Sequence, residues 1–400
     1  MSDPHLHLFD DASWNELLPL TYTRPVAELR LGIRTIREKW EDYLGQSTAY
    51  LTQDYLQAKY PANWGEVNLL INGALLPSPE IAREIQGLEP GTRLSANGKI
   101  VALFPPVGTN LETVTTVGVE KLDVRNLNSN YECVWVEQVS DIFSLNGAAL
   151  NEDFDRITRG RTSAPLDASN RHFGNRLFIE EGAKVRGAIL NSESGPIYLG
   201  KGSEVMEGSL IRGGLALCNN ATLKLGAKIY GPTTVGPHSK VGGEVNNSVI
   251  QGYSNKGHDG FLGNSVIGEW CNLGADTNTS NLKNNYAKVK LWNYPKGGFK
   301  NTGLQFCGLI MGDHSKCGIN TMFNTGTVIG VSANLFGSGF PRNFVPSYAW
   351  GGAAGFSVYR YEKAMEVAEV VMRRRNIDLD EIDRSILATV FERSESYRNF

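Results

Sequence analysis

Aliphatic residues recur at every sixth position along the middle of the chain. The positions that keep this register are Leu199, Val205, Ile211, Leu217, Leu223, Ile229, Val235 and Val241. A spacing of six fits neither the 3.6-residue period of a helix nor the two-residue period of a flat strand. It is typical of short strands joined by corners, each side pointing one apolar side chain to a shared axis. The pattern therefore predicts a parallel β-helix whose coils rest on one another.

The six-residue register shifts twice further along the chain. A second register begins at Phe261 and a third at Met311. Glycine follows several of the apolar positions and makes up 44 of the 400 residues, as expected for a fold with many tight corners. The two breaks, between Val241 and Phe261 and between Thr279 and Met311, predict loops that leave the β-helix, and loops often carry function.

The N-terminal part of the chain has a different pattern. Apolar runs at 67–71, 100–104 and 133–139 are interpreted as strands, and they alternate with helical stretches such as 27–43. This alternation predicts an α/β domain. The polar, unpatterned stretch at 151–169 predicts a boundary between domains.

Two amphipathic helices are predicted at the C-terminal end. Helical spacing of apolar residues runs over 356–375 and ends in three consecutive arginines, 373–375. A second helix is predicted to begin at Asp378, with Glu381 completing a capping box. We interpret the arginines as a complement to the helix dipole rather than an anion site. The helices are expected to cover the open end of the β-helix.

These patterns divide the chain into three expected domains. They are an α/β domain over 1–155, a left-handed parallel β-helix of hexapeptide repeats over 170–345, and a helical cap over 355–400. A formal net charge of −3 argues against a nucleic-acid partner or a polybasic membrane anchor. Five scattered cysteines indicate neither a disulfide framework nor a zinc site, and no apolar run approaches a membrane span. A cytoplasmic protein acting on small molecules is expected.

The segment LLPLTYTRP at 17–25, followed by VAELRLGIRTI, resembles the start of sugar nucleotidyltransferases. With the β-helix behind it, the chain resembles a shortened variant of the bacterial bifunctional N-acetylglucosamine-1-phosphate uridyltransferase/glucosamine-1-phosphate acetyltransferase family. The resemblance implies a truncated, Rossmann-like nucleotidyltransferase domain and acetyl transfer from acetyl-CoA to an amino sugar phosphate. It also implies a homotrimer with active sites between neighbouring β-helices.

The N-terminal half departs from this family at the positions that bind the nucleotide. The family uses a glycine-rich loop, an Arg and a Lys for the phosphates and an Asp for Mg²⁺. Here the loop reads DDASWN, Glu16 stands at the Arg position and Val26 at the Lys position. The strand that normally ends in Gly-Asp reads Asn72-Gly73-Ala74.

Four residues are candidates for a relocated nucleotide site, namely Asp10, Arg24, Arg30 and Asn72. Arg24 or Arg30 would replace the lost cation, and Asp10 or Asp11 the lost carboxylate. The alternative is that these residues cap a helix or lie on its solvated face. Mg²⁺ is expected only if nucleotidyl transfer is retained.

The segment 255–282, NKGHDGFLGNSVIGEWCNLGADTNTSNL, resembles the acetyltransferase core of the family. The match implies that His258 is the general base, which takes a proton from the substrate amine as the amine attacks the acetyl thioester. Imidazole suits this step because it exchanges protons near neutral pH. Asn272 and Asn281 match polar positions that orient the substrate or the acyl carrier. The alternative for His258 is a loop histidine without a role.

The acetyltransferase half also departs from the family. Phe261 stands where the family has Tyr and Asn246 where it has Lys, whereas Glu244 is kept at a substrate position. The lysines that remain as candidates for binding the substrate phosphate are Lys256, Lys283, Lys288 and Lys290. The identity of the sugar is therefore less defined than the type of reaction.

The second register break combines Trp292, Tyr294, Lys296 and Lys300. Aromatic and cationic side chains in a loop at a coil edge are suited to the adenine and phosphates of coenzyme A. They are equally suited to a contact between subunits of a trimer.

Together these observations predict an acetyl-CoA-dependent N-acetyltransferase acting on an amino sugar phosphate, with glucosamine 1-phosphate as the expected acceptor. One alternative is a bifunctional enzyme that also joins a nucleoside triphosphate to a sugar 1-phosphate. The other is a non-catalytic module that binds a nucleotide sugar and regulates a partner. His238 and His314 fall within hexapeptide turns and are interpreted as corner residues. No histidine pair has ligand spacing with carboxylates, so no catalytic metal is expected.

Overall fold

The computed structural model describes residues 3–113, 122–128 and 130–400. The chain forms two compact units. The first comprises Met1–Leu17, Arg24–Leu29 and Arg34–Glu137, and the second comprises Leu18–Thr23, Arg30–Ile33 and Gln138–Phe400. Two short N-terminal segments thus belong to the second unit, and the predicted division at 155 stays a prediction.

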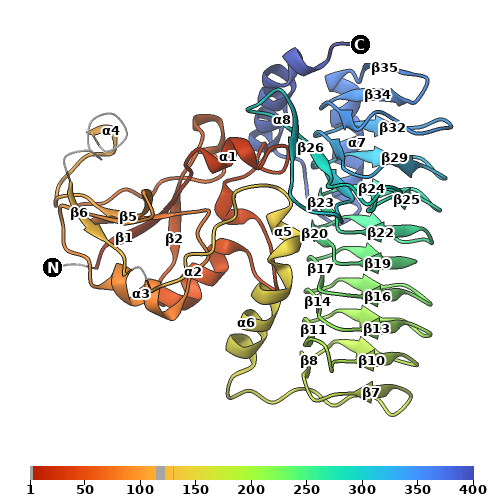
Figure 1. Cartoon of the computed structure of the whole chain (residues 1–400), viewed down its shortest axis with the longest axis horizontal. Coiled ribbons are helices and arrows are strands. Elements are labelled where there is room, and N and C mark those ends of the chain that lie inside the picture. The colour runs from red at the N-terminus through yellow and green to blue at the C-terminus, as the bar shows by residue number, and fades with distance from the viewer. Residues whose placement is uncertain (1–2, 114–121, 129) are drawn as a thin grey trace. The chain divides into compact units, whose positions relative to one another are not determined.

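The first unit is built on a six-stranded mixed sheet in the order β2-β1-β3-β5-β4-β6 (Figure 1). Its strands are β1 His5–Phe9, β2 Thr48–Leu51, β3 Asn68–Asn72, β4 Thr92–Ala96, β5 Lys99–Phe104 and β6 Asp123–Asn126. Its helices are α1 Ser13–Glu16, α2 Ile36–Leu44, α3 Pro79–Gln86 and α4 Leu111–Thr113, with 3-10 turns at Val26–Glu28 and Asp54–Leu56. β1 is parallel to both β2 and β3, whereas β5 is antiparallel to β3 and β4. The predicted α/β domain and its strands at 67–71 and 100–104 are confirmed.

Two predictions in this unit are wrong. Residues 133–139 form no strand, because their main chain bonds to the loop that follows β3: the Val136 amide donates to the Ala74 carbonyl, 2.8 Å away. The helix expected over 27–43 begins only at Ile36. Its start is set by Thr35, whose hydroxyl accepts from the Glu38 amide while the Glu38 side chain accepts from the Thr35 amide.

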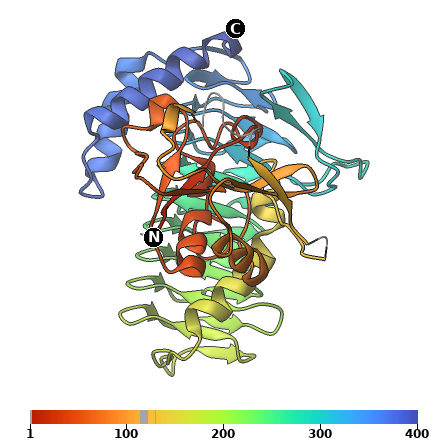
Figure 2. The same ribbon diagram turned by 90° about the vertical axis from the view of Figure 1, so that its left-hand side faces the viewer.

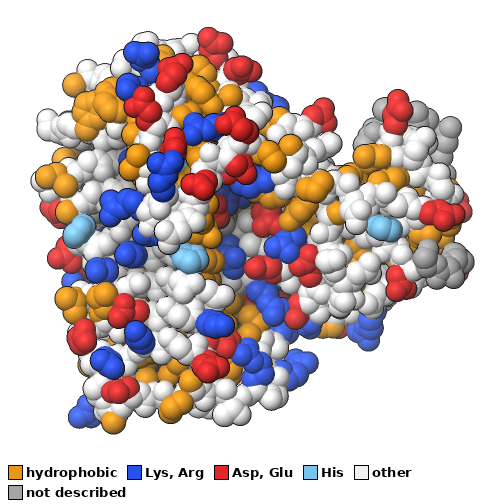
Figure 3. All heavy atoms as spheres, turned by 180° about the vertical axis from the view of Figure 1, so that it is seen from behind, with side chains coloured by type: hydrophobic (Ala, Val, Ile, Leu, Met, Phe, Trp, Pro, Cys, Tyr) orange, Lys and Arg blue, Asp and Glu red, His pale blue; other side chains and the backbone are white. Residues whose placement is uncertain are grey.

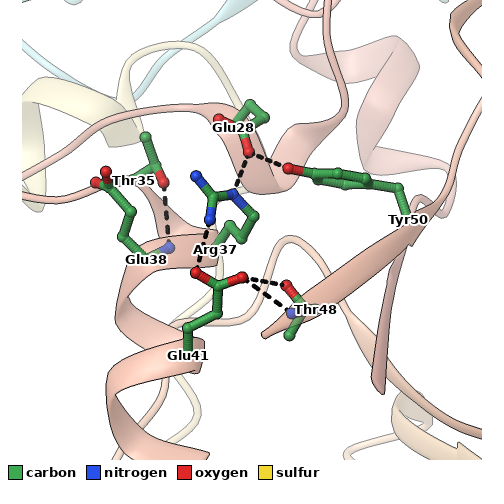
Figure 4. Close-up of polar contacts among 7 residues, drawn as sticks. All are labelled: Glu28, Thr35, Arg37, Glu38, Glu41, Thr48 and Tyr50. Carbon is green, nitrogen blue, oxygen red and sulfur yellow. Dashed lines mark hydrogen bonds and ion pairs between the residues drawn. The ribbon is translucent and has the colours of Figure 1, made fainter. Parts of the chain in front are cut away.

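Arg37 ties helix α2 to the segments on either side of it (Figure 4). Its guanidinium lies 2.5 Å from the Glu28 carboxylate and 2.6 Å from that of Glu41. The Tyr50 hydroxyl also donates to Glu28, and the Thr48 amide donates to Glu41 at 2.9 Å. Burial and the Glu28 carboxylate raise the pKa of Tyr50 above its ordinary value, so the hydroxyl remains a donor.

The second unit is a parallel β-solenoid with three faces, stacked coil on coil in Figure 1. The first face contains β7 Arg171–Phe173, β10 Ile189–Asn191, β13 Leu210–Arg212, β16 Lys228–Tyr230, β19 Glu244–Asn246 and β22 Phe261–Gly263. The second face contains β8 Leu177–Ile179, β11 Ile197–Leu199, β14 Leu215–Leu217, β17 Thr233–Val235, β20 Val249–Gly252, β23 Val266–Glu269, β28 Leu309–Met311, β31 Thr327–Ile329 and β33 Phe344–Val345. The third face contains β9 Lys184–Val185, β12 Glu204–Val205, β15 Thr222–Leu223, β18 Lys240–Val241, β21 Asn255–Lys256, β24 Asn272–Leu273, β29 Lys316–Cys317, β32 Asn334–Leu335, β34 Ala349–Gly352 and β35 Gly355–Val358. Outside these faces, β25 Asn278–Thr279 pairs with β30 Met322–Phe323.

All eight positions of the predicted six-residue register are buried in one core that runs through the coils. The hexapeptide β-helix is therefore confirmed. His238 and His314 are confirmed as corner residues, since both adopt the left-handed backbone conformation, with φ of 58° and 61°.

The two register breaks have different structural causes. Regular coils are eighteen residues long, as from Leu217 to Val235, but Val235 pairs with Ile250 and Ile250 pairs with Ile267. The first break is thus made by coils of fifteen and seventeen residues, and the loop predicted there is wrong. The second break is a true excursion, in which β26 Lys290–Asn293 and β27 Gly298–Asn301 form an antiparallel hairpin.

Helices flank the solenoid at both ends of its sequence. The short helix α5 Asp141–Ser144 and helix α6 Asn146–Thr158 precede it, so the expectation of an unpatterned linker at 151–169 is wrong for its first half. Helices α7 Tyr361–Arg373 and α8 Glu381–Arg393 follow it, and a 3-10 turn at Glu395–Tyr397 ends the chain (Figure 2). The Tyr348 hydroxyl donates to the Leu387 carbonyl of α8. The two predicted helices are confirmed, although α8 is capped by Asp380 rather than Asp378. That they cover the open end of the solenoid stays a prediction.

Candidate functional site

His258 lies at the corner between the third face and the first face of the solenoid. Its side chain is exposed. The corner behind it is held by Lys256, whose ammonium group donates to the His258 carbonyl at 2.8 Å and to the Gly242 carbonyl at 3.0 Å. An exposed imidazole on a fixed backbone is suited to proton transfer with a bound substrate.

Lys256 occupies an unusual place for a lysine. It pairs in register with Val241, so it fills an inward-facing position of the solenoid, and its side chain is only 3% exposed. Burial lowers its pKa to about 8, although Asp259 and Asp276 act in the opposite direction. An ammonium group enclosed in this way binds main-chain carbonyls, so we assign Lys256 a positioning role rather than contact with the substrate phosphate.

The other predicted acetyltransferase residues lie on several parts of the solenoid. Asn272 is on the third face, where its side chain accepts from Asn255 at 3.0 Å. Asn281 donates to Asn264 at 2.8 Å, at the corner between the first and second faces. Glu244 is on the first face.

The candidate lysines of the second excursion are exposed or half-buried. Lys288 and Lys290 are exposed, and the ammonium group of Lys283 lies 3.5 Å from the Lys288 carbonyl. Of the lysines considered for the substrate phosphate, these three are the ones within reach of solvent.

Of the aromatic residues of the hairpin, Tyr294 is buried, Trp292 is half-buried and Phe299 is 41% exposed. The Trp292 ring stacks on Phe344 with centroids 4.0 Å apart. Tyr294 is 4% exposed and packs against Tyr22 and Tyr397. Phe344 thus covers one face of the half-buried Trp292 ring and Tyr294 is buried, whereas the adenine site and the trimer contact expected for this loop stay predictions.

In the first unit, the carboxyl ends of three parallel strands meet at one edge of the sheet. Thr52 follows β2, Asp10 and Asp11 follow β1, and Asn72 ends β3. In open α/β sheets, ligands bind at such an edge where the strand order reverses. Asp10 and Asn72 thus lie at this edge of the sheet, and their role in nucleotide binding stays a prediction.

These side chains bind one another. The Asp10 carboxyl accepts from the Val26 amide at 2.9 Å and from the Thr52 hydroxyl at 2.6 Å, and Asp11 accepts from the Asn72 amide nitrogen at 2.8 Å. Burial raises the pKa of Asp10 to about 7, against the effect of its hydrogen bonds.

This arrangement does not fit Mg²⁺. A carboxyl group that is half protonated near neutral pH is a poor ligand for a hard divalent cation. Within residues 3–113, 122–128 and 130–400, no cluster of three or more His, Cys, Asp or Glu side chains is arranged to hold a metal ion. No step involving a metal is therefore derived for this edge.

The four candidates for the nucleotide site are divided between the two units. Asp10, Arg24 and Asn72 belong to the first unit, where Arg24 is 5% exposed. Arg30 belongs to the second unit, where its amide and carbonyl are both bonded to the Gln251 side chain, at 2.7 and 3.0 Å. Arg30, which lies in the segment that resembles the sugar nucleotidyltransferases, thus packs on the solenoid.

Comparison with known proteins supports both the nucleotidyltransferase resemblance and the acetyltransferase resemblance. Residues 6–162 match the model of a sugar nucleotidyl transferase family. A bifunctional sugar-1-phosphate nucleotidylyltransferase/acetyltransferase of Sulfurisphaera tokodaii is 30% identical over 169 residues, which is 42% of this chain and 39% of the relative. The bifunctional protein GlmU of Methanocaldococcus jannaschii is 36% identical over 87 residues, 22% of this chain and 21% of the relative. The resemblance to the bifunctional family is confirmed.

The chain spans less than two fifths of the length of each of these bifunctional relatives. Among solved structures, an Arabidopsis UDP-N-acetylglucosamine acyltransferase is 14% identical, with 54% of this chain and 78% of that chain covered at a TM-score of 0.29. A likeness this distant says nothing about the substrate of this chain. In the part of the chain that the structure describes, no helix has the length and apolar character of a membrane span.

Proposed function

We propose that the chain is a transferase that moves an acetyl group from acetyl-CoA to the amine of an amino sugar phosphate, with glucosamine 1-phosphate as the first acceptor to test. The observation that carries the proposal is the exposed imidazole of His258 on a corner fixed by the buried Lys256. The name of the Sulfurisphaera tokodaii relative includes the word acetyltransferase and supports the same chemistry.

The proposed step needs one base at the attacking amine. The amine nitrogen forms a bond to the thioester carbon, and the His258 imidazole takes the proton that this nitrogen loses. The carbon–sulfur bond then breaks, and coenzyme A leaves as a thiol with the proton returned by the imidazole. Asn272 and Asn281 are proposed to orient the substrates, and Lys288 is an exposed cation for the sugar phosphate.

The direct test is thiol release from acetyl-CoA in the presence of glucosamine 1-phosphate. We expect free thiol to appear only when both substrates are present. If the wild-type protein releases no thiol with any of a panel of amino sugar phosphates, the proposal is contradicted. This result would favour a non-catalytic module that binds a nucleotide sugar.

Nucleotidyl transfer is a second candidate function, supported by the family model matched over residues 6–162. It would join a nucleoside triphosphate to a sugar 1-phosphate and release pyrophosphate. Because Arg24 is a buried cation of the first unit, Arg24→Ala should then abolish pyrophosphate release. An absence of pyrophosphate with the wild-type protein, with or without Mg²⁺, rejects this function and leaves acetyl transfer untouched.

We also propose a cytoplasmic homotrimer. The first face exposes Phe173, Ile189 and Leu210 at 48%, 42% and 48%, and the groove that they line also contains Glu244. An apolar face of this kind is typical of a surface that is covered on assembly. All five cysteines are free thiols, as suits a reducing compartment. Light scattering should give three times the chain mass of 43.9 kDa, whereas a monomer, or recovery in a membrane or secreted fraction, contradicts the proposal.

A further inference from the structure

A second cavity lies where helix α7 passes the third face of the solenoid, and we call it the α7 pocket. Its volume is about 420 Å³. On the solenoid side it is lined by Asn255, Asn272 and Lys316, which occupy successive coils. Val367 and Val371 of α7 form part of the opposite wall. The size is within the range of small-molecule sites.

The polar lining of the α7 pocket is strongly cationic. Lys240 and Lys316 come from the third face, and Arg374 and Arg375 come from the end of α7. None of the described residues that line the pocket is an aspartate or a glutamate. The chain has a net charge of −3, and acidic and basic side chains are interspersed over the face shown in Figure 3. Four cations that line one pocket without an acidic side chain depart from this mixture and indicate an anionic ligand.

Lys316 is a half-buried residue of the pocket wall. Its ammonium group donates to the His314 carbonyl at 2.7 Å, which is a neutral acceptor. Burial lowers the pKa of Lys316 to about 8. A buried cation is stabilised by an anion, and the pocket is the space in which that anion would lie.

The three consecutive arginines at the end of α7 separate into two groups. Arg373 lies 2.5 Å from Glu369 one turn earlier and does not line the pocket. It is sufficient to complement the helix dipole. Arg374 and Arg375, which follow the last helical residue, line the pocket.

A ladder of stacked rings forms another wall at the corner between the second and third faces. The Tyr253 and Trp270 centroids are 4.3 Å apart with ring planes 16° from parallel. His238 and His314 continue the stack at either end, at 4.9 and 6.2 Å. Of these four rings, those of Tyr253 and Trp270 line the pocket.

We propose that the α7 pocket binds a ligand of nucleotide size that carries a diphosphate. Two guanidinium groups and two ammonium groups match the charge of a diphosphate, and guanidinium groups bind phosphate oxygens in pairs. Asn255 and Asn272 add neutral donors beside the charged ones. A single phosphate would leave part of this cationic lining without a partner.

Two sources of this diphosphate chemistry are available to the proposed function, coenzyme A and a nucleotide sugar. The pocket includes Asn272, which is proposed above to orient a substrate, whereas the His258 corner lies at the other edge of the third face. The inference therefore does not depend on acetyl transfer, although bound coenzyme A would connect the two.

The test is equilibrium binding by titration calorimetry on the full chain, with pyrophosphate, UDP, coenzyme A and orthophosphate as separate probes. We expect pyrophosphate to bind more tightly than orthophosphate, and either coenzyme A or UDP to bind more tightly still. Lys316→Gln and Arg375→Gln should each weaken binding about 10- to 100-fold, the effect of losing a charged hydrogen bond. Arg373→Gln, one residue before the pocket arginines, should bind as the wild type does.

Binding that is equal in all variants, equally weakened by Arg373→Gln, or absent for pyrophosphate, UDP and coenzyme A alike would overturn the inference. Both side chains are half-buried, so if Lys316→Gln does not fold, Arg375→Gln decides the result alone. Because calorimetry needs no turnover, specific binding without any thiol release would reject the proposed acetyl transfer and keep the pocket.

Discussion

His258→Ala should slow thiol release from acetyl-CoA with glucosamine 1-phosphate by about 10²- to 10⁴-fold, the usual contribution of a positioned general base. The loss follows because no imidazole then receives the proton as the amine attacks. The imidazole is exposed, and the Lys256 ammonium group binds the main-chain carbonyl of residue 258 rather than its side chain. The corner should therefore keep its shape, and the thermal midpoint should stay close to that of the wild type.

The matched control is His172→Ala, which removes a histidine from the first coil of the solenoid, where its ring bonds to Ser192. Thiol release should be unchanged in this variant. Equal rates for His258→Ala and the wild type would remove His258 from the mechanism even if the wild type is active. Equal losses in both variants would point to a general effect on the solenoid instead.

The solenoid was predictable because its physical cause is local and repeats. Each coil must bury one aliphatic side chain per face, so residues such as Leu217 and Leu223 repeat this requirement every six positions. The same logic failed at the first break. A shortened coil and a loop insertion shift the register in the same way, and only the strand pairing of Val235 with Ile250 distinguishes them.

Other features of the chain depend on contacts between residues that are far apart in the sequence. Trp292 and Tyr294 have the composition of a ligand loop, but Phe344 and Tyr22, both distant in sequence, cover their rings. The α7 pocket was missed for the same reason. Lys316 and Arg375 are far apart along the chain, and neither belongs to a motif. A signal was present in the aromatic and histidine residues at successive corners, which the register would have aligned into a ladder.

Lys256 shows most directly what the local sequence pattern cannot predict. A lysine in a polar stretch is usually solvated, and the sequence offered it as a phosphate ligand. The register with Val241 places it in the core column of the third face instead. Its two carbonyl partners explain how the solenoid accommodates a charge in a column that includes apolar side chains such as Val241, Leu273 and Cys317.

Lys256 should make the stability of the protein depend on pH in a way that Lys256→Met removes. Its folded-state pKa of about 8 lies below the ordinary value of 10.5 expected for the unfolded chain. Between these two values the unfolded chain binds more protons than the folded chain, so the free energy of unfolding rises with pH. From pH 7 to pH 10 this contribution should amount to about 2–3 kcal/mol.

The measurement is urea unfolding of the wild type and Lys256→Met at pH 7 and pH 10, with the difference between the two proteins followed. At pH 7 the variant loses the donor to Gly242 and His258 but also loses the enclosed charge, so the two effects partly cancel. At pH 10 the wild type should have gained stability relative to the variant. Lys184→Met replaces an exposed lysine of the same face and should show no such change. A difference between wild type and Lys256→Met that is constant with pH would mean that Lys256 is not enclosed as the register requires.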